Sequence, residues 1–402
     1  MFKSIRCLRL ETKIILIGIM ITYFSTFMLT PYLTIFMNSN GFSVFEIGIV
    51  LTSGVIFQQG FTFFGGLVGD KWGYRGTIII GILVRIIGYL LYLVAGNFYM
   101  LIIASSFSGI GGALIVPSTK AIIASLEVDH RTEAFALRNT ALNMGASIGP
   151  LIGAILYKFS FNFIFIIVVL THLFLLILIL KYVNKIKSDN ENKNIFNDFQ
   201  TVIKDKRIIY LMLVSIGFWF LYTQLTLSIP LFITNNLQSE YLIGIVFSIN
   251  AILTICLQFF LIQLTAQKFS SLQIISYGML FMSGAFIIIP LFSSSLGIYF
   301  FIFLFTIAEI LVAPTIDNVA STLTPSNKLL GSYLGFVSLG WAIGGSLGNT
   351  LGGYLYNLFD KLNHISYLWL IYSLVGLSTA LLFRNNFLNE KGKVMVRANK
   401  SI

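Results

Sequence analysis

The chain has 402 residues, of which 57% are hydrophobic and only 10% are charged. A soluble globular domain carries about 25% charged residues, so this composition excludes an ordinary soluble protein. The formal net charge of +11 does not indicate nucleic-acid binding, because the basic residues stand in short segments between apolar stretches. Cys7 and Cys256 offer neither a disulfide framework nor a metal-ligand spacing.

Apolar stretches of about 20 residues, the length that crosses about 30 Å of hydrocarbon as a helix, recur along the whole chain. They predict an all-α membrane protein with 12 transmembrane helices. The expected spans are 14–36, 45–67, 77–95, 98–120, 139–157, 162–182, 208–232, 241–263, 272–292, 296–318, 331–356 and 366–384.

The distribution of basic residues predicts how these spans are oriented. Of the 26 Lys and Arg residues, 23 fall on the side of the two termini. Lys158 and Lys361 fall on the other side, and Arg85 lies within a span. Because cytoplasmic loops carry the excess of Lys and Arg, both termini are expected in the cytoplasm and the chain in the plasma membrane.

The two halves of the chain repeat each other. A polar segment, 184–207, is expected to be a cytoplasmic linker between an N-terminal bundle, 1–183, and a C-terminal bundle, 208–402, that ends in a basic tail. The matching positions, 195–199 residues apart, are Ile47–Val50 with Ile243–Val246, Gly145, Gly149 and Gly153 with Gly340, Gly344 and Gly348, Pro31 with Pro230, and Pro117 with Pro314. Such repeats are typical of secondary transporters, whose substrate site lies between the halves near the midplane.

The segment after the second span carries a specific motif. Gly66, Asp70, Lys71, Gly73 and Arg75 follow a pattern that resembles the loop between helices 2 and 3 of the major facilitator superfamily. The resemblance extends over the whole chain. It implies the major facilitator fold, with two pseudo-symmetric six-helix bundles and transport by alternating access.

The fifth span narrows the resemblance to exporters. Gly145, Gly149, Pro150 and Gly153 resemble the antiporter motif of drug:proton exporters. Gln58–Gly60 and Gly331–Tyr333 resemble multidrug exporters of the MdtH type, and metallophore exporters of Gram-positive bacteria are a second similar branch. We expect the glycines to pack closely against span 8 or span 11. Ordinary packing of small residues between helices is a compatible interpretation.

The resemblance implies a cytoplasmic gate at the first motif. Family members place the acid, here Asp70, at the N-terminal end of helix 11, near Gly331 and Ser332, where a helix dipole favours a carboxylate. Lys71 and Arg75 would have Glu127 and Asp129 within reach beyond span 4. A simpler interpretation is that the basic residues only retain this loop on the cytoplasmic side.

Two residues that such exporters use for proton handling are missing. Helix 4 has Ser105 where an arginine is common, and helix 1 has Gly18 in place of an acid. A charged residue inside a bilayer costs about 2.5–3.5 kcal/mol on insertion scales, so those that remain are candidates for function. Glu309, in the middle of span 10, is the first candidate for the proton site, unless it is a hydrogen-bonded structural acid. Asp317, two turns on, is the second, unless it lies only at the mouth.

The substrate cavity is expected between helices 1, 4, 7 and 10. Arg85 could bind an anionic group of the substrate or form a structural bond to Gln58 or Gln59, and His172 is expected to be a packing residue. The remaining cavity candidates are Tyr23, Tyr32, Trp219, Tyr222 and Gln224. The large number of aromatic residues weakens this assignment, because most of the 38 Phe and 18 Tyr must face lipid or neighbouring helices.

Together these features predict a secondary active transporter that exports small amphipathic molecules, such as drugs or a secreted metallophore, in exchange for protons. A proton-coupled importer of a sugar, amino acid or peptide on the same fold is the alternative. No nucleotide-binding motif, metal motif or nucleophile–base pair occurs, so no enzymatic activity and no cofactor besides the proton motive force are expected. The expected partners are a small-molecule substrate, protons and the lipid bilayer of a bacterial cell, with the protein as a monomer and no nucleic acid.

Overall fold

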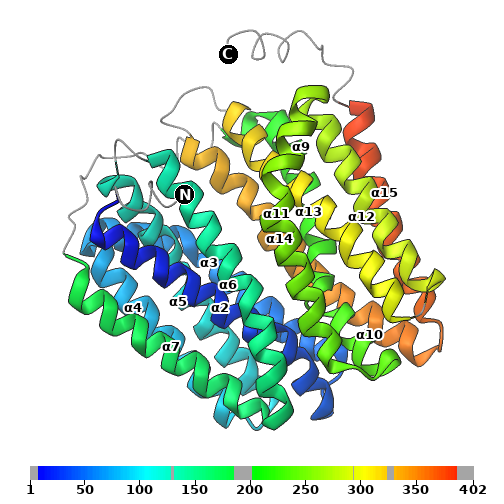
Figure 1. Cartoon of the computed structure of the whole chain (residues 1–402), viewed down its shortest axis with the longest axis horizontal. Coiled ribbons are helices and arrows are strands. Elements are labelled where there is room, and N and C mark those ends of the chain that lie inside the picture. The colour runs from blue at the N-terminus through cyan, green and yellow to red at the C-terminus, as the bar shows by residue number, and fades with distance from the viewer. Residues whose placement is uncertain (1–7, 128–130, 185–201, 293, 324–329, 387–402) are drawn as a thin grey trace.

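The computed structural model describes residues 8–127, 131–184, 202–292, 294–323 and 330–386. The first half of the chain forms one bundle and the second half forms another beside it (Figure 1). The helices are α2 (Leu10–Ser39), α3 (Val44–Trp72), α4 (Tyr74–Val94), α5 (Phe98–Leu126), α6 (Arg131–Phe159), α7 (Phe161–Tyr182), α9 (Lys206–Tyr222), α10 (Ser228–Leu237), α11 (Glu240–Lys268), α12 (Ser271–Leu291), α13 (Ser295–Leu323), α14 (Leu330–Lys361) and α15 (Ile365–Asn386).

Within the described part of the chain, ten segments are long and apolar enough to cross a membrane, with α9 and α10 counted as one. Helices α14 and α15 complete the twelve predicted spans. The prediction of an all-α membrane protein with two six-helix bundles is confirmed. Most helices extend a few residues beyond the predicted limits, because the apolar pattern marks only the part inside hydrocarbon and the helix continues into the polar interface.

The helix lengths show the repeat directly. Helices α3 and α11 both have 29 residues, α4 and α12 both have 21, and α5 and α13 both have 29. In each pair the second helix begins 196 or 197 residues after the first. The two bundles are therefore built on one plan, and a position in one half has a defined counterpart in the other.

The seventh span departs from its prediction, because the expected single helix 208–232 is broken into α9, a 3-10 turn (Thr223–Leu225) and α10. Pro230 has no N–H and cannot bond the carbonyl of Thr226, four residues earlier. That carbonyl accepts a hydrogen bond from the Thr34 hydroxyl of α2 at 3.1 Å instead. A bond between the two halves thus replaces one that the helix cannot make, as a break inside a membrane requires.

Buried polar side chains stabilise the same break from within the C-terminal half. Gln224 is fully buried, and its Nε2 donates to the carbonyls of Phe220 and Gly348, both at 2.9 Å. Its Oε1 accepts from the Ser228 hydroxyl at 2.7 Å. The Ser228 hydroxyl also lies 3.2 Å from that of Tyr372 on α15. Because each polar atom of the Gln224 side chain has a partner, the network ties α9, α10, α14 and α15 together.

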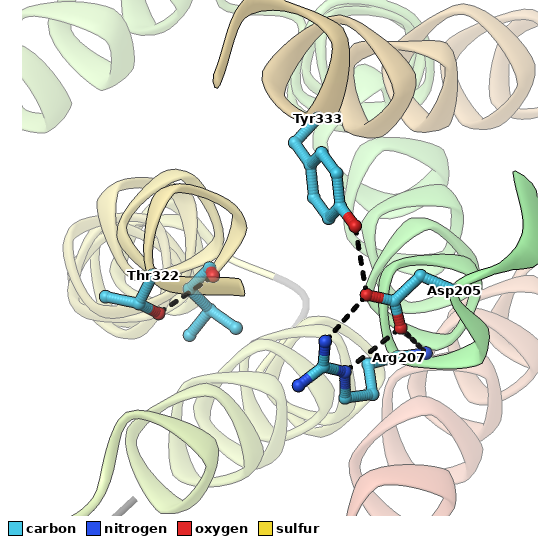
Figure 2. A network of polar contacts seen from close by, with 5 residues as sticks. Asp205, Arg207, Thr322 and Tyr333 are labelled. Atoms are coloured by element: carbon cyan, nitrogen blue, oxygen red, sulfur yellow. Dashed lines mark hydrogen bonds and ion pairs between the residues drawn. The ribbon is translucent and has the colours of Figure 1, made fainter. Parts of the chain in front are cut away.

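One end of the molecule, which we call the motif side, carries the junction of α3 and α4 at Gly73 and the first residues of α9 and α14. Asp205 caps the N-terminus of α9 by accepting from the Arg207 N–H at 3.0 Å. Its carboxylate also bonds the Arg207 guanidinium at 2.8 and 3.0 Å, and the Tyr333 hydroxyl donates to it at 3.1 Å. Figure 2 shows this network, which holds the start of α14 against the start of α9.

The opposite end, the far side, is where the two halves make close contact. The Thr52 hydroxyl of α3 donates to the carbonyl of Ser346 on α14 at 3.0 Å. The backbone of Gly48 lies so close to the carbonyl of Asn349 that a Cβ at Gly48 would overlap it. Since α3 begins and α14 ends at the far side, these contacts close the space between the halves at that end.

Candidate functional site

A pocket lies between the two halves and is lined by residues of both. The N-terminal half contributes residues of α2 and α6, and the C-terminal half contributes residues of α9, α11 and α13. The lining residues are Phe27, Leu142, Asn143, Ala146, Tyr222, Phe247, Asn250, Ala251, Thr254 and Glu309. Its volume is about 50 Å³, room for a few water molecules rather than a drug-sized ligand, so a larger substrate needs the halves to move apart.

The pocket walls come from three of the four expected helices and from two others. Of the predicted helices 1, 4, 7 and 10, three contribute, as α2, α9 and α13. Helix 4, which is α5, contributes none of the residues that line this pocket, whereas α6 and α11 do. Three of the polar residues of the wall, Asn143, Asn250 and Thr254, come from these two helices.

Glu309 is the only acid among the residues that line the pocket. Its Oε1 accepts from the Tyr222 hydroxyl at 3.3 Å, and its Oε2 accepts from Asn250 Nδ2 at 2.7 Å. Both donors are uncharged, and within the described part of the chain no Lys, Arg or His lies within ion-pair distance of this carboxyl. The carboxyl is half-buried, and a partly desolvated carboxylate without a counter-ion is costly, so a proton or a cationic ligand group can remove that cost.

Asn250 is a site residue that the sequence reasoning missed. It is 9% exposed on α11, and its Nδ2 also donates to the Thr306 hydroxyl at 3.0 Å. The available signal was an uncharged amide in the middle of an apolar span, which the search for charged groups passed over. Together Asn250 and Tyr222 fix the orientation of the Glu309 carboxyl from two neighbouring helices.

Aromatic rings continue from the pocket in both halves. Tyr23 stacks on Phe27 with ring centroids 6.4 Å apart. Trp219 packs against Tyr222 at 5.0 Å and against Trp341 at 5.3 Å. Among the predicted cavity residues, Tyr222 therefore lines the pocket, and Tyr23 and Trp219 each contact a lining residue.

Two other predicted cavity residues lie elsewhere. Tyr32 is fully buried nearer the far side, where its hydroxyl donates to the carbonyl of Pro150 at 3.1 Å. Gln224 belongs to the network that stabilises the break in the seventh span and does not line the pocket. Both residues carry a polar group and lie in a span that lines the pocket. The rotation of each helix nevertheless turns their side chains toward neighbouring helices instead of the pocket.

Arg85 is buried within the N-terminal half, at 5% exposure. It donates to the Thr26 hydroxyl of α2 at 3.2 Å and lies 6.0 Å from the centre of the Tyr89 ring, so the alternative of a bond to Gln58 or Gln59 is not what the structure shows. His172 packs edge-on against Tyr89 at 5.1 Å, as expected for a packing residue. Arg85 is not among the residues that line the pocket.

The motif Gly66–Arg75 is described in part. Gly73 ends α3 and starts α4 at φ +90°, a backbone conformation that favours glycine. Lys71 is exposed, and Arg75 donates to the carbonyl of Leu180 at 2.7 Å near the end of α7. The side chains of Asp70 and Ser332 lie outside the described part of the structure, so the predicted contact of Asp70 with helix 11 stays a prediction.

The expected acidic partners of this motif have other roles or are not described. Glu127 is 4% exposed and accepts from the N–H of Arg9 at 2.9 Å, rather than pairing with Arg75. Asp129 lies outside the described residues. Of the basic residues of the motif, Arg75 therefore contacts the end of a helix, where the carbonyl groups favour a positive charge.

The glycines of the fifth span pack against α2, not against span 8 or 11 as expected. A Cβ at Gly145 or Gly149 would overlap the backbone of α2 at Met20 or Phe24, and one at Gly153 would lie 2.7 Å from the Tyr32 ring. The neighbouring face of α6 does approach span 8. A Cβ at Gly244 of α11 would stand 3.0 Å from that of Ala154 and 3.3 Å from the carbonyl of Pro150. The motif thus packs α6 tightly on α2 and presents Pro150 to the other half.

Asp317, the second candidate for proton coupling, is exposed on the motif-side part of α13 and does not line the pocket. It lies eight residues beyond Glu309, toward the end of the helix. The structure therefore separates the two acids, with Glu309 in the pocket and Asp317 outside it, nearer the motif side.

Comparison with known proteins agrees with this architecture. Residues 15–329 match the family model described as Major Facilitator Superfamily. The chain is 27% identical over 355 residues to multidrug resistance protein MdtH of Yersinia pestis (strain Pestoides F) and to that of Yersinia pseudotuberculosis serotype O:1b, with 88% of each chain covered.

Two solved structures of POT family transporters share the fold. One, in complex with 5-aminolevulinic acid, superposes with a TM-score of 0.77 at 16% identity and covers 93% of this chain and 95% of its own. The other, with a thioalcohol-conjugated peptide, reaches 0.78 at 15% identity, with coverage of 95% and 98%. The matched family model, the two repeated bundles and the pocket between them establish that this multi-pass membrane protein belongs to the Major Facilitator Superfamily of transporters.

Proposed function

We propose that the protein exports small amphipathic molecules in exchange for protons, with Glu309 as the proton-binding group. The observation that carries this proposal is a single carboxyl in the pocket between the halves, held only by the neutral donors Tyr222 and Asn250. Its charge can be neutralised by a proton or by a cationic group of the substrate. An exchanger requires a site of this kind, which binds either a proton or the substrate.

The pocket surroundings support an amphipathic substrate. Phe27 and Phe247 supply aromatic surface, and Asn143 and Thr254 supply hydrogen-bonding groups. A pocket that is mostly apolar with a few placed polar groups is typical of binding sites for small molecules. The similarity to MdtH, a multidrug resistance protein, agrees with this class of ligand, and a secreted metallophore is a narrower possibility within it.

The direction of transport depends on orientation. The positive-inside rule supports a cytoplasmic motif side, because 23 of the 26 Lys and Arg residues are expected on that side. The far side, where Gly48 meets Asn349, then faces outward and is closed. In this conformation the pocket would receive its substrate from the cytoplasm.

The first experiment measures transport in inside-out membrane vesicles with an acidic lumen. Export predicts that ethidium accumulates in the lumen while protons leave it, and that collapsing the gradient stops accumulation. Accumulation of a sugar, amino acid or peptide in right-side-out vesicles under an inward proton gradient, without ethidium export, would replace this proposal by the importer.

The second experiment tests the proton site with Glu309→Gln. The amide keeps the shape of the carboxyl but cannot gain or lose a proton, so we expect gradient-driven accumulation to fall to background while downhill substrate exchange persists. Asp360→Asn, which neutralises an exposed acid at the end of α14, is the matched control and should transport normally. Unchanged export and pH dependence in Glu309→Gln would show that the proton binds elsewhere.

A further inference from the structure

A second hollow in the C-terminal half lies between α11, α12 and α13. Its volume is about 320 Å³, compared with about 50 Å³ for the pocket between the halves. We call it the outer groove, and its lining residues are Thr265, Phe269, Ile274, Tyr277, Phe281 and Leu311. Leu311 and Glu309 both belong to α13, but they are two residues apart and so point about 200° apart around its axis. The outer groove and the pocket therefore lie on opposite faces of α13.

The outer groove forms because α11 packs less closely on α13 than its counterpart α3 packs on α5. Gly65 and Gly69 of α3 permit the closer approach, and a Cβ at Gly65 would overlap the carbonyl of Ala113 on α5. The matching positions of α11, 196 residues later, are Leu261 and Thr265. These larger side chains prevent the same approach and leave the groove open between α11 and α13.

The outer groove has a buried floor and exposed walls. Ile274 and Leu311 form the floor and are 6% and 4% exposed. Phe269, Tyr277 and Phe281 form the walls, and each is at least 40% exposed. The surface inside the groove is apolar. Because these helices cross a bilayer, hydrocarbon is the medium around this surface, and an empty groove would deprive its lining of contacts.

The groove extends through the motif-side half of the bilayer. Phe269 lies in the turn between α11 and α12, on the motif side. Phe281 is ten residues after Ser271, the first residue of α12, and therefore about 15 Å from that end of the helix. One leaflet contributes half of a hydrocarbon core of about 30 Å, which is also about 15 Å. The groove thus has the length that an acyl chain spans in the motif-side leaflet.

Lys268 places a positive charge at the motif-side end of the groove. It is the last residue of α11, is exposed, and directly precedes Phe269. It forms no ion pair with any residue that the structure describes. The N-terminus of α12 beside it is already capped by Ser270 and Gln273. Since anionic headgroups attract basic residues at the membrane surface, Lys268 complements the phosphate of a lipid whose chain enters the groove.

We propose that the outer groove binds an anionic phospholipid of the motif-side leaflet, with one acyl chain along α12 and the phosphate near Lys268. The acyl chain packs on Leu311, so the lipid and the transported substrate occupy opposite faces of α13. The inference depends on the membrane-spanning fold. It depends neither on export nor on Glu309 as the proton site, and its tests measure lipid binding rather than transport.

Native mass spectrometry of the purified protein tests the headgroup preference, with dioleoyl phosphatidylglycerol and dioleoyl phosphatidylcholine as probes. The two lipids share their acyl chains, but only phosphatidylglycerol has a net negative charge. The protein should bind it about fivefold more tightly, the preference expected from one lysine near the surface. Lys268→Gln should lose this preference, whereas Lys361→Gln, which removes an exposed charge at the end of α14, should keep it. Equal binding of the two lipids by the parent, or an unchanged preference in Lys268→Gln, would overturn the proposal.

Thr265→Phe tests the groove itself by filling it. The Thr265 hydroxyl donates only to the carbonyls of Leu261 and Ile262 in its own helix, so no bond to another helix is lost. The variant should bind one lipid fewer, whatever the headgroup. Ala266→Phe adds the same ring at the next residue, which is exposed but does not line the groove, and should bind as the parent does. The same number of bound lipids in both variants would contradict the proposal.

Photo-cross-linking locates the lipid in reconstituted vesicles. A phosphatidylglycerol with a diazirine in one acyl chain should label the segment 265–281 more than other exposed helix surfaces, and Thr265→Phe should reduce that label several-fold. Label spread evenly over the exposed helices, and unchanged in Thr265→Phe, would show only the general lipid surroundings and would refute a site in the groove.

Discussion

Gly48→Ala is expected to shift the protein away from the conformation described here. A Cβ at this position would overlap the carbonyl of Asn349 on α14, and that carbonyl is backbone, so it cannot rotate away. Overpacking of this kind costs typically about 1–3 kcal/mol. Alanine also favours the helix over glycine by about 1 kcal/mol, but this gain is the same in both conformations and cancels. The closed far side alone is penalised, and its population relative to the open state should fall about 5- to 150-fold.

Spin labels on each half give the measurement. Asn40, at the end of α2, and Leu362, just beyond α14, are exposed at the far side, and the distance between labels there reports closure. The short-distance population should shrink in Gly48→Ala. Gly60→Ala makes the same substitution in the same helix, where no atom lies within 4 Å of the new Cβ, and should leave the distribution unchanged. Identical distributions in Gly48→Ala and the parent would refute the reasoning, as would an equal shift in Gly60→Ala.

Three further predictions concern stability, measured by thermal unfolding in detergent. The Arg207 guanidinium holds the pKa of Asp205 below its ordinary value near 3.8, so the cap stabilises the protein above that pH and its contribution is lost as the pH falls through the lowered pKa. Asp205→Asn should therefore destabilise by no more than about 1 kcal/mol at neutral pH and by less in acid, and a pH-independent difference would count against the network. Gln224→Ala should destabilise more, by about 2–4 kcal/mol, because it leaves buried carbonyls without donors, and a change under about 0.5 kcal/mol would exclude that role. Gly73→Ala should cost about 1–3 kcal/mol from its positive φ, and a gain in stability would show that the junction relaxes freely.

Much of this fold could be predicted because a bilayer leaves few solutions. Each apolar stretch must be a helix, and the repeat of Ile47–Val50 at Ile243–Val246 already paired α3 with α11. What the sequence did not provide was the rotation of each helix about its axis. The small-residue pattern of α6 was recognisable, but whether Gly145 would face α2 or α11 depends on that rotation. The break at Pro230 likewise depends on a tertiary partner, the Thr34 hydroxyl, which no local pattern indicates.

The site shows the same limit at the level of single residues. Glu309 stood out because an acid in the middle of an apolar helix is rare, and the structure places it in the pocket. Its role as the proton site stays a prediction. Asn250 did not stand out, since an uncharged amide costs less to bury and occurs in membrane helices for packing alone. Only its 2.7 Å bond to Glu309 distinguishes it.

The position of Glu309 also suggests how neutralisation could be linked to movement. Its two donors, Tyr222 and Asn250, belong to the same half as the acid, so this network does not hold the halves together. The wall opposite is formed by Phe27, Leu142 and Ala146, with Asn143 as its one polar side chain and no positive charge. Bringing that wall against the charged acid would replace its remaining water by at most one neutral donor, whereas a protonated carboxyl or one paired with a cation carries a much smaller penalty. The halves would then rock past Glu309 only when it is neutralised, by a proton in one direction and by substrate in the other, which is the condition for exchange.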